Sequence, residues 1–152
     1  MRRMALLAVF GVFAFLLSGC GATKKPEIGL VDDSLRSCPD SPNCVSSMAT
    51  NDAQRVGPFQ LQASHEKAWA LVKRTIQKLP RTRIVSSTDN YLHAECRSAV
   101  FGFTDDLELQ LMPQQNQITI RSAARFGYFD FEVNRKRVEK LTSQLRAAGV
   151  IL

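Results

Sequence analysis

Arginine and acidic side chains gather in three segments of the C-terminal half, and these residues are the best suited to bind an anion or to exchange protons. The segments span residues 91–98, 101–106 and 121–137. Guanidinium groups bind phosphate or carboxylate through paired hydrogen bonds, and the first amides of a helix suit the same ligands. An anion-binding pocket or an internal ion-pair network is expected from Arg97, Asp105, Asp106, Arg121, Arg125, Asp130, Asn134, Arg135 and Arg137.

Arg137 is the most informative member of this set. It lies four residues before Leu141, close to the apolar stripe of a predicted helix. A guanidinium beside a buried stripe needs an acidic partner, because an unpaired buried charge is costly. Asp105, Asp106 and Asp130 are the candidates for that partner.

An enzyme would need a nucleophile with a base, or two carboxylates in suitable geometry. His93 and Cys96 are three residues apart on a predicted strand, so their side chains point to opposite faces of a sheet. Asp105 and Asp106 are adjacent, and such a pair more often caps a solvated turn. We therefore expect a protein that is not an enzyme, and a hydrolase using these aspartates with His93 or Glu95 is the alternative.

The first residues are typical of a lipoprotein signal. Arg2 and Arg3 precede an apolar stretch over residues 5–17, which as a helix would reach roughly 20 Å and fall short of the ~30 Å hydrocarbon core of a bilayer. Leu-Ser-Gly-Cys at residues 17–20 matches the bacterial lipobox, which predicts cleavage after residue 19 and acylation of Cys20. An ordinary signal peptide is the alternative.

Export changes the interpretation of the charge. Acyl chains on Cys20 would hold the chain on a membrane, and Gly21 in place of an aspartate favours the outer membrane, facing the periplasm, if the source has two membranes. Removing Arg2 and Arg3 lowers the net charge from +6 to +4, and this excess lies within residues 121–152. An exported basic segment meets anionic lipid, phosphorylated glycolipid or acidic protein, so no nucleic acid partner is expected.

Three cysteines remain once Cys20 is acylated. Cys38 and Cys44 flank a segment with two prolines and an asparagine, which favours a reversal that brings the sulfurs together. We expect a Cys38–Cys44 disulfide; pairing of either residue with Cys96, or three free thiols, are the alternatives. Too few histidines and cysteines lie nearby for zinc or copper, so no metal site and no cofactor are expected.

The pattern along the chain predicts a signal peptide over residues 1–19, an extended tether over 20–37 and a single domain over 38–152. Apolar spacing and turn residues predict one strand, a first helix, four further strands and a last helix; the ranges are 58–62, 64–79, 83–88, 91–98, 107–112, 117–122 and a helix from about Asn134. Short connections favour an antiparallel sheet. We expect a two-layer α+β domain with four to five strands, two helices on one face and a polar opposite face.

Four segments together resemble the domain-of-unknown-function 1499 family, over about residues 35–145. They are the three segments above and residues 38–47. The resemblance implies a small bacterial or plastid domain, often exported, without an established activity. Cys96 stands where the family is expected to carry a bulky apolar residue, which favours a core position for Cys96 over essential chemistry.

Six aromatic residues lie in glycine-containing connections and not in regular elements; they are Phe101, Phe103, Phe126, Tyr128, Phe129 and Phe131. A secondary core beneath two loops is the favoured interpretation, and a ligand site or a patch that touches lipid or a partner is the alternative.

As function, we expect a membrane-anchored module that binds an anionic or amphipathic envelope component, or a partner protein, through the polar sheet face and the Arg-rich loop. A purely structural envelope protein is a third hypothesis.

Overall fold

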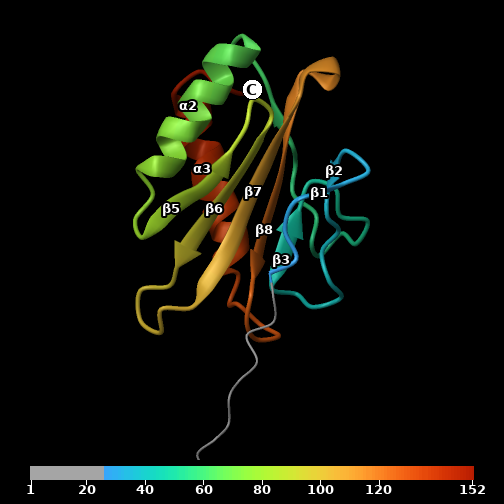
Figure 1. The fold of residues 1–152 in the computed structure, drawn as a ribbon, viewed down its shortest axis with the longest axis vertical. Coiled ribbons are helices and arrows are strands. Elements are labelled where there is room, and N and C mark those ends of the chain that lie inside the picture. The colour runs from blue at the N-terminus through green and yellow to red at the C-terminus, as the bar shows by residue number, and fades with distance from the viewer. Residues whose placement is uncertain (1–25) are drawn as a thin grey trace, which may run out of the picture.

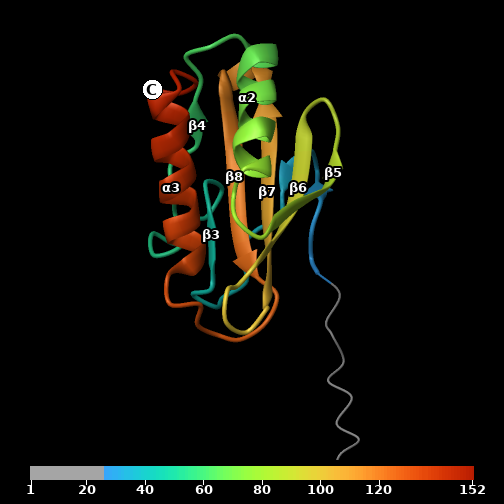
Figure 2. The same ribbon diagram turned by 90° about the vertical axis from the view of Figure 1, so that its left-hand side faces the viewer.

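A computed structural model describes residues 26–152, so the signal segment, Cys20 and the first part of the predicted tether lie outside the described residues. A six-stranded antiparallel sheet packs against two helices, α2 (His65–Gln77) and α3 (Val133–Ala147), as Figures 1 and 2 show. The predicted α+β class is confirmed, whereas the predicted strand count and strand order are wrong. Within the described part of the chain, no helix has the length and apolar character needed to cross a bilayer.

Four strands form the predicted antiparallel meander. They are β5 (Thr82–Ser87), β6 (Tyr91–Arg97), β7 (Thr104–Met112) and β8 (Gln117–Ala124), and each pairs with the next. A short 3-10 turn, η2 (Pro113–Gln115), joins β7 to β8 and ends at Asn116 in the left-handed region. The alternating pattern of β7 and β8 places leucines and isoleucines under the helices, because successive side chains of a strand point to opposite faces.

Two short strands complete the sheet at the outer edge of β8. The strand β4 (Phe59–Gln60) pairs with the beginning of β8, and β3 (Cys44–Ser46) pairs with its end. The resulting order is β3-β8-β7-β6-β5 with β4 beside β8. Strands of two or three residues are too short to carry a periodic pattern, so β3 could not be found from sequence.

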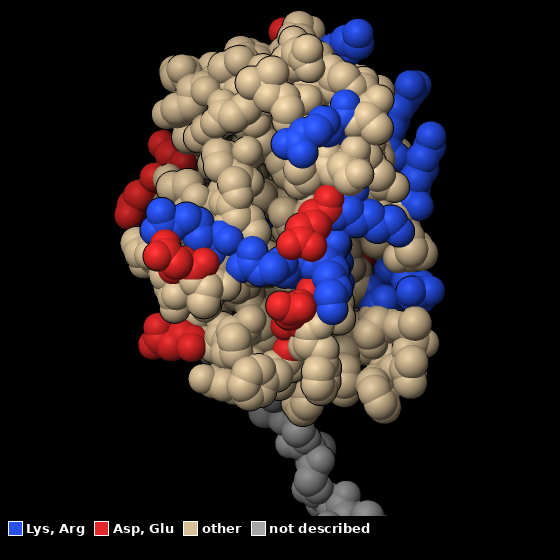
Figure 3. All heavy atoms as spheres, turned by 180° about the vertical axis from the view of Figure 1, so that it is seen from behind, with Lys and Arg blue, Asp and Glu red and all other residues tan. Residues whose placement is uncertain are grey.

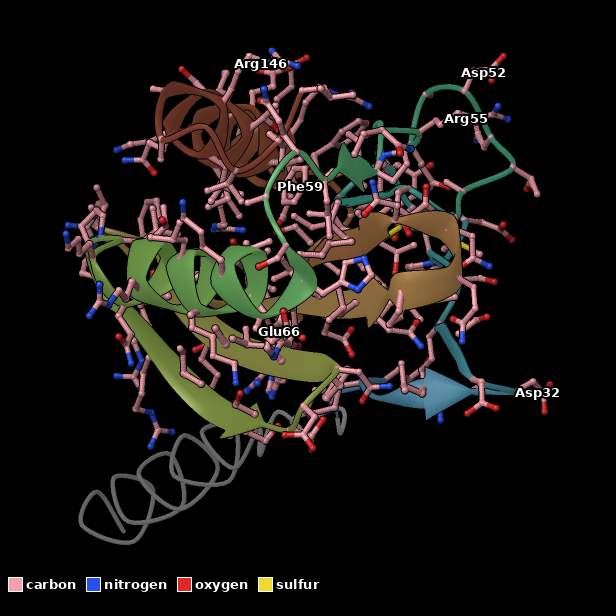
Figure 4. The ribbon with its side chains drawn as sticks, turned by 90° about the horizontal axis from the view of Figure 1, so that it is seen from above. Asp32, Asp52, Arg55, Phe59, Glu66 and Arg146 are labelled. Atoms are coloured by element: carbon pink, nitrogen blue, oxygen red, sulfur yellow. A yellow bond between two sulfur atoms is a disulfide. The ribbon has the colours of Figure 1, made fainter. Side chains whose placement is uncertain are left out.

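A small hairpin lies against the other face of the sheet. It consists of β1 (Leu30–Val31) and β2 (Ser34–Leu35), and its turn at Asp32 and Asp33 is visible at one side in Figure 4. The side-chain amide of Gln110 on β7 donates to the Asp33 carbonyl at 2.8 Å. Residues 30–35, which the sequence predicts to be part of an extended tether, therefore form a hairpin that covers the polar face of the sheet.

The hydrophobic core lies between the sheet and the helices. Trp69, on the apolar stripe of the helix predicted over residues 64–79, is buried there, and its indole N–H donates to the Thr88 carbonyl at 3.2 Å. Phe59 enters the same core from β4 and lies between the two helices in Figure 4. Cys96 is a buried free thiol in this core, consistent with the predicted core position.

Candidate functional site

Asp105 and Asp106 lie inside a strand and not at a solvated turn, because β7 begins at Thr104. The prediction that they cap a turn is therefore wrong. As neighbours on a strand they point to opposite sides: Asp105 faces the helices, and Asp106 faces the hairpin that covers the other side. The residues expected to form one site are consequently divided between two faces of the sheet.

Asp106 is the centre of a buried ionic network on the hairpin side. Its Oδ1 lies 2.7 Å from His93 Nε2, and the guanidinium of Arg125 donates to its two oxygens at 2.7 and 2.9 Å. Burial alone would raise the pKa of Asp106, but the hydrogen bonds from His93 and Arg125 outweigh it and lower the pKa. Asp106 is therefore an ionised structural partner.

The same guanidinium extends the network to Glu95. Arg125 Nη2 donates to Glu95 Oε1 at 2.8 Å, and Arg83 donates to the other carboxylate oxygen at 3.1 Å. These hydrogen bonds, from Arg125 first and then Arg83, lower the pKa of Glu95. Arg125 thus joins β6, β7 and the segment after β8.

Glu108 forms a second buried centre on this side and is 0% exposed. Its carboxylate accepts hydrogen bonds from Arg121, the Tyr91 hydroxyl and the Gly29 amide, each at 2.7 Å. Burial, and next the hydrogen bond to Glu108, raise the pKa of Tyr91. Along β7 and β8 the polar face is therefore buried and its charges are mutually paired, whereas Arg83 on β5 remains 74% exposed.

A small cavity lies beside Arg121 and Arg125. It has a volume of about 80 Å³, and the first described residues, Pro26 and Glu27, form part of its wall with Asp106. Arg121 Nε is a buried side-chain nitrogen without a hydrogen-bond partner within residues 26–152. Ligand pockets for small organic molecules usually measure a few hundred Å³, so this cavity is too small for a lipid headgroup.

Arg137 lies on the helix side, where it contacts Asp105 among its three candidate partners. Arg137 Nη2 donates to Asp105 Oδ2 at 2.6 Å, and Nη1 donates to Ser122 Oγ at 2.9 Å and to Asn134 Oδ1. Burial raises the pKa of Asp105 despite the opposing charge of Arg137. This second ion pair fixes α3 to β7 and β8.

The side chain of Asp130 accepts hydrogen bonds from backbone amides at the beginning of α3. Its carboxylate accepts the backbone N–H groups of Glu132 at 3.0 Å and Asn134 at 2.9 Å, and Asn134 itself is fully buried. The Asp130 carboxylate therefore occupies the position in which an anion would meet the Glu132 and Asn134 amides at this helix start. Arg135 points elsewhere and donates to the carbonyls of Ala53 and Arg55.

The remaining expected residue, Arg97, lies in a surface groove of about 350 Å³. The groove runs between the end of α2, the adjoining ends of β5 and β6, and the first turns of α3. Its basic side chains define what is here called the basic groove; they are Arg81, Arg97, Lys136, Arg137 and Lys140. Arg81, Lys136 and Lys140 are not among the candidate site residues expected from the sequence, because exposed cations on a helix or loop most often only solvate the surface.

The positive charge of the basic groove is only partly neutralised. Arg137 is paired with Asp105, and Lys136 lies 3.6 Å from Glu132. Among residues 26–152, no ion pair is formed by Arg81, Arg97 or Lys140. Figure 3 shows the α3 side of the molecule, where Lys and Arg side chains form a band across the surface with fewer acidic side chains between them.

A larger groove of about 650 Å³ lies between β4 and α3, but its cations are already engaged. Arg135 donates to two carbonyls of the loop before β4, and Arg146 donates to the Leu152 carbonyl at 2.8 Å. Arg55 pairs with Asp52 at 3.3 Å on the long loop labelled in Figure 4. In the basic groove Arg81 also donates to a carbonyl, that of Arg97, at 3.3 Å. The side chains of Arg97 and Lys140 make no hydrogen bond or ion pair within residues 26–152, so the basic groove is the better anion site.

The six aromatic residues of the two loops are exposed, with fractions from 47% for Phe103 to 86% for Phe131. The favoured prediction of a secondary core is thus wrong. Phe103 stacks on Phe101 and on Phe126, with ring centroids 5.6 and 5.5 Å apart, so the β6–β7 and β8–α3 loops touch. Hydrophobicity alone could not separate a core from a surface patch.

Within residues 26–152, two cysteines are paired and the third is buried. Cys38 and Cys44 form a disulfide, as expected, with Cα atoms 5.7 Å apart. Burial raises the pKa of the Cys96 thiol, and this side chain faces the helices whereas His93 faces the hairpin. In the described part of the chain, no group of three or more His, Cys, Asp or Glu residues could hold a metal ion.

Comparison with known proteins gives a family but no activity. No curated protein matches this sequence, and no solved structure matches it. The profile of the DUF1499 family, described as a protein of unknown function, matches residues 34–145. Because that match covers most of the sequence, the chain belongs to the DUF1499 family.

Proposed function

We propose that this protein is a non-enzymatic lipoprotein of the cell envelope that binds an anionic headgroup in the basic groove. The observation that carries the proposal is the set of unpaired cations Arg81, Arg97 and Lys140 around a groove of about 350 Å³. Phosphate and carboxylate groups are the natural ligands of such a site. A groove of this volume accommodates one headgroup of a phospholipid or glycolipid.

The lipid anchor rests on the Leu-Ser-Gly-Cys sequence at residues 17–20. Acylation of Cys20 would hold the domain at a membrane, facing the periplasm from the outer membrane in a bacterium that has two membranes. The ligand would then belong to the surface on which the protein is held.

The buried position of the acid–base candidates argues against the hydrolase alternative. His93 is 2% exposed and Asp106 is 3% exposed, and Pro26 and Glu27 lie beside Asp106 in the wall of the small cavity. A general base must come within hydrogen-bond reach of its substrate, and Asp106 already accepts hydrogen bonds from His93 and Arg125.

Binding of short-chain phosphatidylglycerol, compared with phosphatidylcholine of the same chain length, tests the groove. The lipidated protein in neutral detergent is titrated by calorimetry at two salt concentrations. In the test variant, Arg97→Gln is combined with Lys140→Gln; in the matched control, Lys67→Gln is combined with Arg74→Gln. All four side chains are exposed and form no ion pair within residues 26–152, and each double substitution removes two positive charges.

We expect the groove variant to lose about tenfold or more in affinity for phosphatidylglycerol, since each charge-assisted hydrogen bond contributes about 1.5–3 kcal/mol. The control should change less than about twofold. Equal losses in the two variants, or equal affinity for the two lipids, would show that general surface charge explains the binding and would refute the proposed site.

A further inference from the structure

We propose that the six exposed aromatic residues form a surface that inserts into the interface of the bilayer to which Cys20 is attached. This surface, the aromatic end, consists of Phe101, Phe103, Phe126, Tyr128, Phe129 and Phe131. The proposal rests on the lipid anchor of the proposed function, and it adds an orientation of the domain on the membrane.

The aromatic end is an organised surface and not a scatter of single residues. Phe101, Phe103 and Phe126 stack in succession across two loops, and Tyr128 meets Phe129 edge-on with centroids 4.8 Å apart. Phe129 and Phe131 also line one groove. Monomeric soluble proteins rarely expose several large aromatic side chains together without a partner. Aromatic rings are enriched where a protein meets the headgroup level of a bilayer.

The start of the described chain fixes which end of the domain lies near the anchor. Pro26 and Arg125 line the same small cavity, and Arg125 is the residue immediately before Phe126. Cys20 precedes Pro26 by six residues, which span at most about 20 Å when fully extended. An acylated Cys20 therefore holds the domain within a short distance of the membrane, beside the aromatic end.

The arrangement of the loops agrees with this orientation. Figures 1 and 2 show the β6–β7 and β8–α3 connections together at the lower end of the molecule, whereas the C-terminus lies at the upper end. Residues 98–103 include no charged residue. In the second loop Asp130 is engaged by backbone amides and Glu132 lies 3.6 Å from Lys136, so insertion would not desolvate an isolated acidic group.

The basic groove borders the same end. Ser98 and Ala99 of the first loop line it, and so does Val133, two residues after Phe131. Insertion of the aromatic end would bring Arg97 and Lys140 to the level of the phosphates, where Lys and Arg gain from anionic lipid. Charge and apolar surface therefore favour the same orientation.

Phe131 is exposed although its backbone adopts an unfavourable left-handed conformation. Its φ is 55° and that of Glu132 is 63°, a conformation that L-residues other than glycine rarely adopt. The hydrogen bonds that Asp130 accepts fix this turn. A strained backbone that exposes a phenylalanine is more consistent with a binding surface than with a packing requirement.

Quenching of tryptophan fluorescence by brominated acyl chains tests the proposal on the full lipidated protein. The vesicles consist of phosphatidylcholine and phosphatidylglycerol with and without bromine. A Phe126→Trp variant probes the aromatic end, and a Leu152→Trp variant is the control, because Leu152 is an exposed apolar residue near the C-terminus at the opposite end. Both are made with Trp69→Phe; if that background does not fold, Trp69 is kept and its own quenching is subtracted.

We expect at least about twofold quenching in the Phe126→Trp variant and little in the Leu152→Trp variant, since interfacial side chains reach roughly 5–10 Å into the boundary of the acyl chains. Equally weak quenching of the two variants, in chains that remain on the vesicles, would overturn the inference. It would mean that the aromatic end faces solvent or a second copy of the chain. It would leave the lipid anchor and the basic groove intact. A chain that does not stay with the vesicles would overturn both proposals.

Discussion

Arg125 should be one of the most important side chains for the stability of the domain. It donates three hydrogen bonds of 2.7–2.9 Å to two carboxylates, and its side chain is 24% exposed. Removing one partner of a buried ion pair usually costs about 3–5 kcal/mol, because the other charge stays buried and unpaired. Partial solvent access at Arg125 reduces that figure, so we expect Arg125→Ala to lower the free energy of unfolding by about 2–4 kcal/mol.

Arg83→Ala is the matched control. Arg83 also pairs with Glu95, at 3.1 Å, but its side chain is 74% exposed. Exposed pairs contribute about 0–1 kcal/mol, so the loss should be several times smaller than for Arg125→Ala. The assay is urea unfolding at pH 7, with the dependence on urea compared among the variants to verify two-state behaviour. Similar losses in the two variants would refute the conclusion that the buried network stabilises the polar face.

Three further predictions concern stability. Asp106→Asn should make the unfolding free energy less sensitive to acid, measured by urea unfolding from pH 6 to pH 2. In the folded protein the pKa values of Asp106 and Glu95 are lowered. The stability that these two carboxylates give is therefore present above their unfolded pKa values of about 4, and it is lost as the pH falls through their folded pKa values. Unchanged acid sensitivity would contradict this. Replacing Cys38 and Cys44 by alanine should cost roughly 2 kcal/mol, seen equally when the unsubstituted chain is reduced. Phe131→Gly should raise the unfolding temperature, because a left-handed residue other than glycine costs about 1–2 kcal/mol, and should weaken insertion of the aromatic end; a lower unfolding temperature would refute the strain argument.

Local patterns were sufficient for the regular elements. The spacing of Trp69, Val72 and Ile76 predicted α2, and the alternation in β6 predicted that His93 and Cys96 point to opposite faces. Each of these features depends on periodicity within one element. The strand β3 was missed because it is determined by pairing with the distant strand β8. The local hairpin of β1 and β2 was missed because two-residue strands are too short to carry a periodic pattern.

The candidate site was harder to predict, because the faces of the sheet divide it. Asp105 and Asp106 were expected at a turn, but β7 starts three residues earlier than the apolar alternation indicates. Burial of the polar face depends on residues 26–36, whose composition resembles that of a linker. Lys140 gains its significance only from Arg81 and Arg97 across the groove, a proximity that no spacing along the chain encodes.

Neutron reflectometry of the lipidated protein on a supported bilayer containing phosphatidylglycerol tests the central claim most directly, since it measures the water between domain and headgroups. We expect protein density to overlap the headgroup layer without an intervening water layer. A water layer should appear when Phe101, Phe126 and Phe131, all highly exposed, are replaced by serine. A water layer beneath the unsubstituted protein, or the same density profile for both proteins, would contradict the claim that this end of the domain is built to rest on a membrane.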